Sequence, residues 1–409
     1  DDLETPAVDG LAARGVRFTQ FYAAAPVCSP SRAGLLTGRY PWRVGLPGNA
    51  GAGPSEEIDD LSESNAKGGL HDEAVTLAER FAAAGYRTAH IGKWHLGHRP
   101  GAKPLDQGFE YSFGHMCGCI DNYAHFFYWN GPNRHDLWEN NARVRMPGQF
   151  FPDLMVDKAV EFIKRPSDEP FLIYFASNAP HYPYQGDDKW LRRYAALPYP
   201  RNLYAAFLST LDERVGRLLK ALEDVGAHDN TIVVYQSDNG HSTEARAHFG
   251  GGSAGPYRGA KFSLFEGGIR LPAIISWPAA LPHGAVRDQM AHACDWAPTL
   301  LALCEIEASD DEFDGRSLVD VLHSAEAASP HGPVHWDLSN QWAVREGPWK
   351  LIHNVRPTAG PELAKADREW FLANVVDDPS ETRNHAADEP QIVAKLRERH
   401  AEMRASERP

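Results

Sequence analysis

Residues 153–176, DLMVDKAVEFIKRPSDEPFLIYFA, hold an amphipathic segment followed closely by an apolar one. In the first half, apolar residues recur at spacings of three and four, which predicts a helix over 153–164 with one buried face. Pro170 then introduces a continuous apolar run over 171–176, which is typical of a strand covered on both faces. The stretch therefore predicts one helix–strand unit of an α/β fold.

The same unit recurs twice along the chain. A helical pattern over 73–84 precedes an apolar run over 86–91, and a longer one over 203–224 precedes a run over 231–236. Continuous apolar strands suit a parallel sheet that carries helices on both faces. We therefore expect an α/β fold with a doubly wound, mostly parallel sheet flanked by helices, extending over residues 1–320.

The pattern changes toward the C-terminus. Short apolar runs separated by turn signals such as Glu346-Gly347-Pro348 predict a small antiparallel sheet, and a charged helix is expected over 389–405. The runs are 333–338, 341–345, 349–353 and 370–375. We expect these elements to form a small subdomain over 330–409.

Composition excludes several classes of protein. The 409 residues are 43% hydrophobic and 23% charged, unlike a disordered chain or a coiled coil. The net charge of -14 argues against a nucleic-acid partner. Apolar runs stay far below the roughly 18 residues of a membrane span, so none is expected. The 5 cysteines are an odd number without zinc-like CxxC pairs, so no disulfide framework or structural metal site is predicted.

Polar side chains follow each of the three predicted strands. Lys93 and His95 come after the first strand, His181 after the second, and Asp238 and Asn239 after the third. The carboxyl ends of strands in a doubly wound sheet form the crevice where ligands bind. Each residue alone has an ordinary structural explanation, but their recurrence at one sheet edge predicts a functional site.

The segment 28–39, CSPSRAGLLTGR, is the most informative one for chemistry. Ser29 followed by Pro30 is typical of a cap and a first helical residue, which places Cys28 at a helix N-terminus, where exposed N–H groups favour an anion. Cys28 is then either a nucleophile with a lowered pKa or a small buried thiol. The residues alone leave both interpretations open.

This segment matches the C-x-P-S-R…L-T-G-R signature of the type I sulfatases, members of the alkaline phosphatase superfamily. Gly92-Lys93-Trp94-His95 resembles the G-K-W-H loop of the family, 178–181 its histidine loop, and Asp238-Asn239-Gly240 its metal-binding loop. Lys261 resembles its second active-site lysine. The resemblance covers nearly the whole chain and implies an alkaline-phosphatase-like fold.

The resemblance also implies a chemistry, the hydrolysis of sulfate monoesters by formylglycine, into which a maturation enzyme converts Cys28. One Ca²⁺ is implied per site, held by Asp238, Asn239 and the oxygen of residue 28. The implied catalytic residues are Cys28, Arg32, Lys93, His95, His181 and Lys261. Among them the lysines offset the sulfate charge, Arg32 and His95 position the nucleophile, and His181 or Lys261 protonates the leaving oxygen. Sulfated carbohydrates or small sulfate esters are the implied substrates, and the implied location is periplasmic or secreted.

In one respect the sequence departs from the family. Members of the family begin with a strand that ends in two calcium-binding aspartates, and these lie well upstream of the position that matches Thr5-Pro6. Asp1 and Asp2 lie too close to Thr5-Pro6 to be that pair. We therefore expect that the first strand and two metal ligands are missing from residues 1–409. Calcium would then have fewer oxygens than the six to eight that it prefers.

Substrate contacts are predicted in the region 109–138, which is rich in aromatic and polar residues. Our hypothesis is that Asp121, His125 and Arg134 contact a carbohydrate, and the alternative is a loop whose aromatic residues form a satellite core. His241 and Arg258 are further candidates.

Two alternative functions stay open. A phosphate or phosphonate monoester hydrolase of the same superfamily would share the sheet and the metal loop. A non-catalytic relative would bind sulfated glycans without cleaving them.

Overall fold

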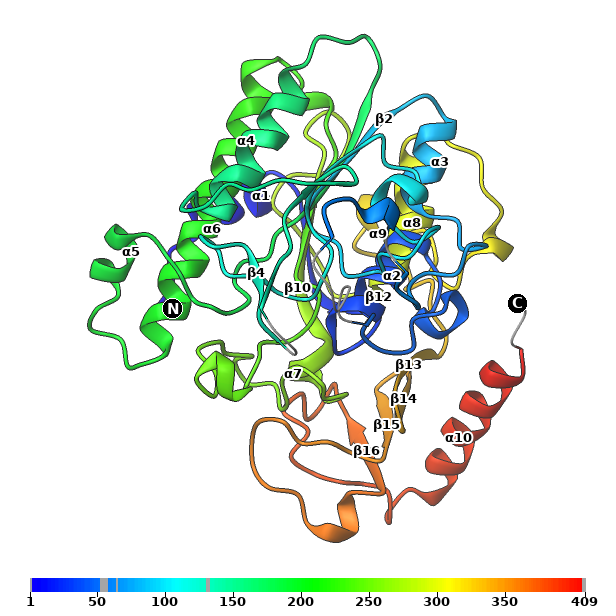
Figure 1. Ribbon diagram of the computed structural model, residues 1–409. Helices are drawn as coiled ribbons and strands as arrows, with labels where there is room; N and C mark the ends of the chain where they lie inside the picture. Colours follow the sequence, from blue (N-terminus) through cyan, green and yellow to red (C-terminus); the bar gives the residue numbers. More distant parts are fainter. Residues whose placement is uncertain (1, 52–57, 64, 130–132, 407–409) are drawn as a thin grey trace.

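The computed structural model describes residues 2–51, 58–63, 65–129 and 133–406, so Asp1 lies outside the described residues. Two sheets stand side by side in the centre of the molecule, with helices on both faces, and a smaller sheet packs below them (Figure 1). Residues 16–276 carry most of the strands of the two central sheets. The expected α/β class with a small C-terminal antiparallel sheet is confirmed.

The first central sheet has the strand order β11-β1-β10-β9, and β12 also pairs with β1. Its strands are β1 (Val16–Tyr22), β9 (Val233–Gln236), β10 (Arg270–Ser276), β11 (Ala285–Arg287) and β12 (Ala291–His292). β10 runs antiparallel to both β1 and β9, whereas β11 and β12 run parallel to β1. The sheet is therefore mixed, which sequence periodicity cannot reveal because it carries no information on strand direction.

The second central sheet has the order β7-β6-β3-β2-β8. Its strands are β2 (Arg87–Lys93), β3 (Tyr111–His115), β6 (Trp138–Glu139), β7 (Ala142–Arg143) and β8 (Phe171–Ala176). β2 pairs in parallel with both β3 and β8, as expected for helix–strand units. A separate hairpin joins β4 (Phe126–Phe127) and β5 (Arg134–His135).

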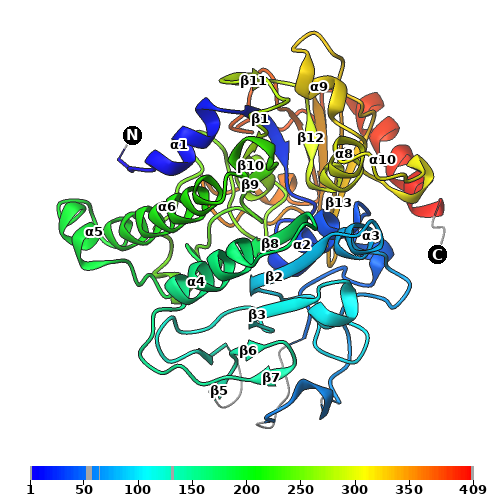
Figure 2. The same cartoon turned by 90° about the horizontal axis from the view of Figure 1, so that it is seen from above.

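Helices form a layer on each face of the central sheets (Figure 2). One layer holds α1 (Pro6–Ala13), α4 (Phe151–Lys164) and α6 (Arg201–Asp224), with α5 (Asp188–Arg193) packed on α6. The other holds α2 (Cys28–Thr37), α3 (Leu77–Ala83), α8 (Trp296–Leu303) and α9 (Val319–His323). The expected helix over 73–84 begins only at Leu77, because Thr76 and Glu79 form a capping box there.

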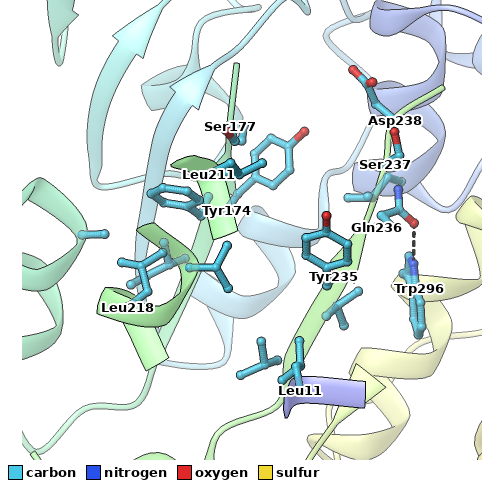
Figure 3. A pocket seen from close by; sticks show the side chains of 18 of the residues that line it. Leu11, Tyr174, Ser177, Leu211, Leu218, Tyr235, Gln236, Ser237, Asp238 and Trp296 are labelled. Atoms are coloured by element: carbon cyan, nitrogen blue, oxygen red, sulfur yellow. Dashed lines mark hydrogen bonds between the residues drawn. The ribbon is translucent and has the colours of Figure 1, made fainter. Parts of the chain in front are cut away.

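A gap separates β8 from β9 (Figure 3). Among the described strands, β8 pairs only with β2 and β9 only with β10, so each keeps one unpaired edge. Both strands line a cavity of about 1670 Å³, together with Leu11, Leu211 and Leu218. Residues 171–175 and 233–236 are consequently half-buried, although the sequence predicts fully buried strands.

The C-terminal sheet, defined as β13–β16, is antiparallel in the order β13-β14-β15-β16. Its strands are β13 (Val334–Leu338), β14 (Gln341–Glu346), β15 (Trp349–His353) and β16 (Trp370–Asn374), and α10 (Pro390–Ala405) packs against β14. Lys350 joins this sheet to the short helix α7 (Glu266–Ile269), because its buried ammonium contacts Glu266 at 2.7 Å and Glu381 at 2.8 Å. Among the described residues, no helix is both long and apolar enough to span a membrane.

Candidate active site

Cys28 is the first residue of helix α2 and is 3% exposed. Val27, in extended conformation, caps the helix, so α2 begins slightly earlier than the Ser29-Pro30 pair predicts. Asn49 accepts a hydrogen bond from the Ser29 amide at 3.1 Å, and the Ser29 hydroxyl accepts one from Ala50 at 3.0 Å. These contacts hold the N-terminal turn of the helix, and with it Cys28, against a neighbouring loop.

Arg32, one helical turn after Cys28, connects three elements of the site. Its Nε and Nη2 donate to Oδ2 of Asp238, just after β9, at 3.1 and 2.8 Å. Its Nη1 donates to the carbonyl of Lys93, at the end of β2, at 2.8 Å, and to the hydroxyl of Tyr174 on β8 at 3.3 Å. The expected meeting of strand ends at one site is therefore present, with Arg32 as its common partner.

Two buried lysines face Cys28, Lys93 from the end of β2 and Lys261 from the segment before α7. Lys93 is 2% exposed and Lys261 is 6% exposed, and both lie close enough to act on the thiol electrostatically. Burial alone raises the pKa of the Cys28 thiol, but the positive charges of Lys93 and Lys261 outweigh it and the net pKa is lowered. A site with this potential attracts an anion.

Two predicted histidines lie in the same positive field. Burial, with Lys93 and Arg32 in addition, holds the pKa of His95 well below its usual value. Burial and the charge of Lys261 likewise hold the pKa of His181 well below the usual value. The Nδ1 of His181 lies 2.8 Å from the carbonyl oxygen of Tyr182. Since a carbonyl only accepts, Nδ1 carries the proton and Nε2 of the neutral ring is left with a lone pair.

Glu244 belongs to this cluster although no sequence motif points to it. Its Oε2 lies 3.4 Å from the Nζ of Lys261. Burial lowers the pKa of Lys261, but Cys28 and Glu244 reverse the effect and the net pKa is raised. Glu244 follows Asp238 in a stretch without periodicity, so only its polar character could have marked it in the sequence.

The residues expected to bind Ca²⁺ provide only part of such a site. The buried Oδ1 of Asn239 has no hydrogen-bond partner, as a ligand oxygen would, but Arg32 occupies one oxygen of Asp238. Across the described residues, no three or more His, Cys, Asp or Glu side chains are grouped so that they could hold a metal ion. Calcium prefers six to eight oxygens, so the described residues by themselves do not fit it.

The structure does not bring Asp121, His125 and Arg134 to the cavity wall. Asp121 accepts hydrogen bonds from the amides of residues 123 and 124 and from the side chain of Gln185. His125 is fully buried with its Nε2 3.0 Å from a backbone carbonyl, and Arg134 is buried with its guanidinium over a phenyl ring. These contacts favour the alternative of a packed loop, and the carbohydrate contacts of the three residues stay a prediction.

The two remaining substrate candidates separate in the structure. His241 lines the cavity, and its carbonyl accepts a hydrogen bond from the amide of Lys261 at 2.9 Å. Arg258 lies away from the cavity, where it donates to the carbonyls of Glu381 and Pro361 and packs over Phe265. Arg258 therefore connects the segment before Lys261 to the C-terminal segment, and its contact with a substrate stays a prediction.

Comparisons with known proteins agree with this geometry. Residues 1–306 match the family model "Sulfatase", and residues 259–406 match "N-sulphoglucosamine sulphohydrolase, C-terminal". The chain is 31% identical to arylsulfatase J of Mus musculus, over 97% of this chain and 71% of that protein. It is 35% identical to N-acetylgalactosamine-6-sulfatase of Sus scrofa, over 78% of this chain but only 61% of that protein. The crystal structure of Ps i-CgsB in complex with k-i-k-neocarrahexaose superimposes with a TM-score of 0.84 at 26% identity, covering 100% of this chain and 89% of that one.

Proposed function

The chain belongs to the sulfatase family, and from that premise we propose that it hydrolyses sulfate monoesters of carbohydrates at the cavity beside Cys28. The observation that carries the proposal is the position of Cys28 at a helix N-terminus, facing Lys93 and Lys261. An O-sulfate group is an anion, so this field stabilises it when it binds and stabilises the negative charge that develops on the leaving oxygen. N-acetylgalactosamine-6-sulfatase, a relative named for a sulfated sugar, supports the substrate class.

Residue 28 supplies the nucleophile in this proposal. Conversion of Cys28 to formylglycine by a maturation enzyme would provide a hydrated aldehyde, one hydroxyl of which would attack sulfur while the ester S–O bond breaks and the alcohol leaves with a proton. Loss of the proton of the second hydroxyl would then restore the aldehyde and release sulfate. Arg32 and the α2 N-terminus hold the side chain in line, and Lys93 neutralises the sulfate oxygens. A periplasmic or secreted location goes with this proposal.

Lys261 is the stronger candidate for protonating the leaving oxygen. Burial lowers its pKa, but the neighbouring carboxylates Glu244 and Asp238, which remain when residue 28 is converted, favour its charged form, an ammonium that can give up a proton. His181, with a lowered pKa and its Nδ1 proton directed at the Tyr182 carbonyl, is neutral in the free site and presents the Nε2 lone pair. We therefore assign His181 to orienting the ester and Lys261 to proton donation.

The gap between β8 and β9 concerns the completeness of the calcium site that the resemblance to the family implies. We propose that oxygens additional to those of the described residues complete the calcium site at Asp238 and Asn239, beside the edges of β8 and β9 that line the cavity. The supporting observations are the unpaired edges, the half-buried strand residues and the unpartnered Oδ1 of Asn239.

Paired kinetics test the function. The full chain, matured in a host with the formylglycine-generating system, is assayed on an aryl sulfate and on the matching aryl phosphate, and peptide mass mapping reports the state of residue 28. We expect sulfate to be the preferred substrate, and Lys261→Ala to lower kcat by roughly 100-fold or more. A preference for phosphate would assign the chain to the phosphoesterases. Binding of a sulfated glycan without turnover, in protein with formylglycine at position 28, would assign it to the non-catalytic class.

A further inference from the structure

We propose that Glu244 is a positioning residue that holds the ammonium of Lys261 and the loop of His181 in one fixed arrangement, an inference that rests on the proposed function. Glu244 lies in the segment after β9, Lys261 lies farther along the chain before α7, and Tyr182 lies in the segment after β8. Glu244 and Lys261 share the stretch between β9 and α7, where the amide of Lys261 donates to the carbonyl of His241 at 2.9 Å. The Tyr182 segment is joined to this stretch through the side chain of Glu244.

A single carboxylate oxygen of Glu244 accepts three side-chain hydrogen bonds. Oε2 of Glu244 accepts a hydrogen bond from the Ser242 hydroxyl at 2.8 Å, one from the Tyr182 hydroxyl at 3.0 Å, and one from Nζ of Lys261 at 3.4 Å. The amide of Glu244 also donates to the Ser242 hydroxyl at 3.2 Å, which fixes the backbone of the carboxylate-bearing residue. The side chain of Glu244 is 21% exposed and that of Lys261 only 6%, so these bonds are partly shielded from water.

The Tyr182 contact extends the influence of Glu244 to the catalytic histidine. The ring of Tyr182 lies against that of His181, with centroids 4.2 Å apart, and its carbonyl lies 2.8 Å from the His181 Nδ1. The hydroxyl that Glu244 anchors therefore holds the Tyr182 ring against which the His181 ring packs, while the Tyr182 carbonyl sets the tautomer of His181. Through Oε2, Glu244 couples the two residues that face the leaving oxygen.

The charge of Glu244 distinguishes positioning from substrate binding. A carboxylate 3.4 Å from a cation that must receive a sulfate ester opposes the binding of that anion. If Glu244 served only to bind substrate, its sign would be wrong. Its removal should therefore leave KM unchanged or lower it, while kcat falls because Lys261 and His181 lose their fixed positions.

Three variants test the assignment kinetically. Glu244→Ala removes all the contacts, Glu244→Gln keeps an acceptor for Tyr182 and Ser242 without the charge, and Tyr182→Phe removes only the hydroxyl. We expect Glu244→Ala to lower kcat for an aryl sulfate roughly 10- to 100-fold without a rise in KM, and the other two variants to fall between it and the wild type. A wild-type kcat in Glu244→Ala, or a raised KM with unchanged kcat, would overturn the proposal. If Glu244→Ala does not fold, Glu244→Gln is judged by the same two criteria.

A second readout does not need turnover. Acetylation of Lys261 by acetic anhydride is followed by peptide mass mapping, with the exposed Lys220 as the internal reference. Loss of the Glu244 charge frees the amine, so the Lys261 rate should rise severalfold in Glu244→Gln relative to wild type. Faster acetylation of Lys261 in Glu244→Gln supports the role of Glu244 even if the wild type fails to cleave the aryl sulfate. That failure would overturn only the proposed function. An unchanged rate overturns the role of Glu244 whatever the activity.

Discussion

The fully buried ion cluster around Lys350 makes a demanding prediction about stability. Replacement by methionine keeps much of the side-chain volume but removes the charge between Glu266 and Glu381, whose oxygens lie 2.7 and 2.8 Å from Nζ. All three side chains have 0% exposure, so water cannot take the place of the ammonium. Removing one partner of a buried pair costs about 3–5 kcal/mol of unfolding free energy.

The second carboxylate sets how that cost depends on pH. Burial raises the pKa of Glu381 to about 7, even though Lys350 opposes the effect. Without Lys350 the folded-state pKa rises further above its unfolded value of about 4.5. The folded protein then binds a proton that the unfolded chain releases, so Lys350→Met should lose less stability at about pH 5 than at about pH 8.

Lys395→Met is the matched control. Its ammonium lies 2.6 Å from Glu346, but its side chain is 54% exposed, so the pair should contribute no more than about 1 kcal/mol. Urea unfolding followed by tryptophan fluorescence reports both variants, because Trp336 is buried in β13 of the C-terminal sheet. Equal losses in the two variants, or a Lys350→Met loss that does not grow with pH, would refute the reasoning.

Two further predictions concern single contacts. A Cβ added at Gly118 would lie 2.7 Å from Cε1 of the buried His95 ring, so Gly118→Ala should lower kcat roughly 10- to 100-fold by displacing that ring; Gly332→Ala, which meets nothing within 4 Å, should leave kcat unchanged. His331 lies 2.7 Å from the buried Asp295, and despite the opposing effect of burial that carboxylate raises the pKa of His331. The His331–Asp295 ion pair therefore contributes its full stabilisation below the pKa of about 6.5 that His331 has in the unfolded chain. This stabilisation is lost as pH rises through the pKa of His331 in the folded protein. Unfolding free energies of wild type and His331→Gln should differ more at about pH 6 than at about pH 9, and a constant difference would contradict this.

Local patterns in the sequence determined the helix–strand units and the C-terminal strands. The strand expected over 171–176 has the bounds of β8, and the strands expected in the C-terminal region agree with β13–β16 to within a residue at each end. These features depend on side chains a few positions apart, such as the apolar face of α4 or the Thr76–Glu79 capping box. Neighbours along the chain are sufficient to specify them.

Strand ends also allowed most of the candidate site to be predicted. Lys93, His181 and Asp238 each follow an apolar strand, and the carboxyl ends of neighbouring strands must converge. The signature around Cys28 added the nucleophile. For these residues, position relative to a local element was enough to bring them to one site.

Only the tertiary structure decided how the remaining polar groups are used. Asp121 and His125 look like ligands for a sugar, yet they form hydrogen bonds with Gln185 and with the carbonyl of Gln149. Glu244, which no motif marks, meets a lysine 17 positions away and a tyrosine 62 positions away. Whether a polar side chain faces a cavity or a backbone group depends on the packing of segments distant in sequence. Residue type and spacing carry no record of that packing, and the open edges of β8 and β9 became visible only when the whole chain was folded.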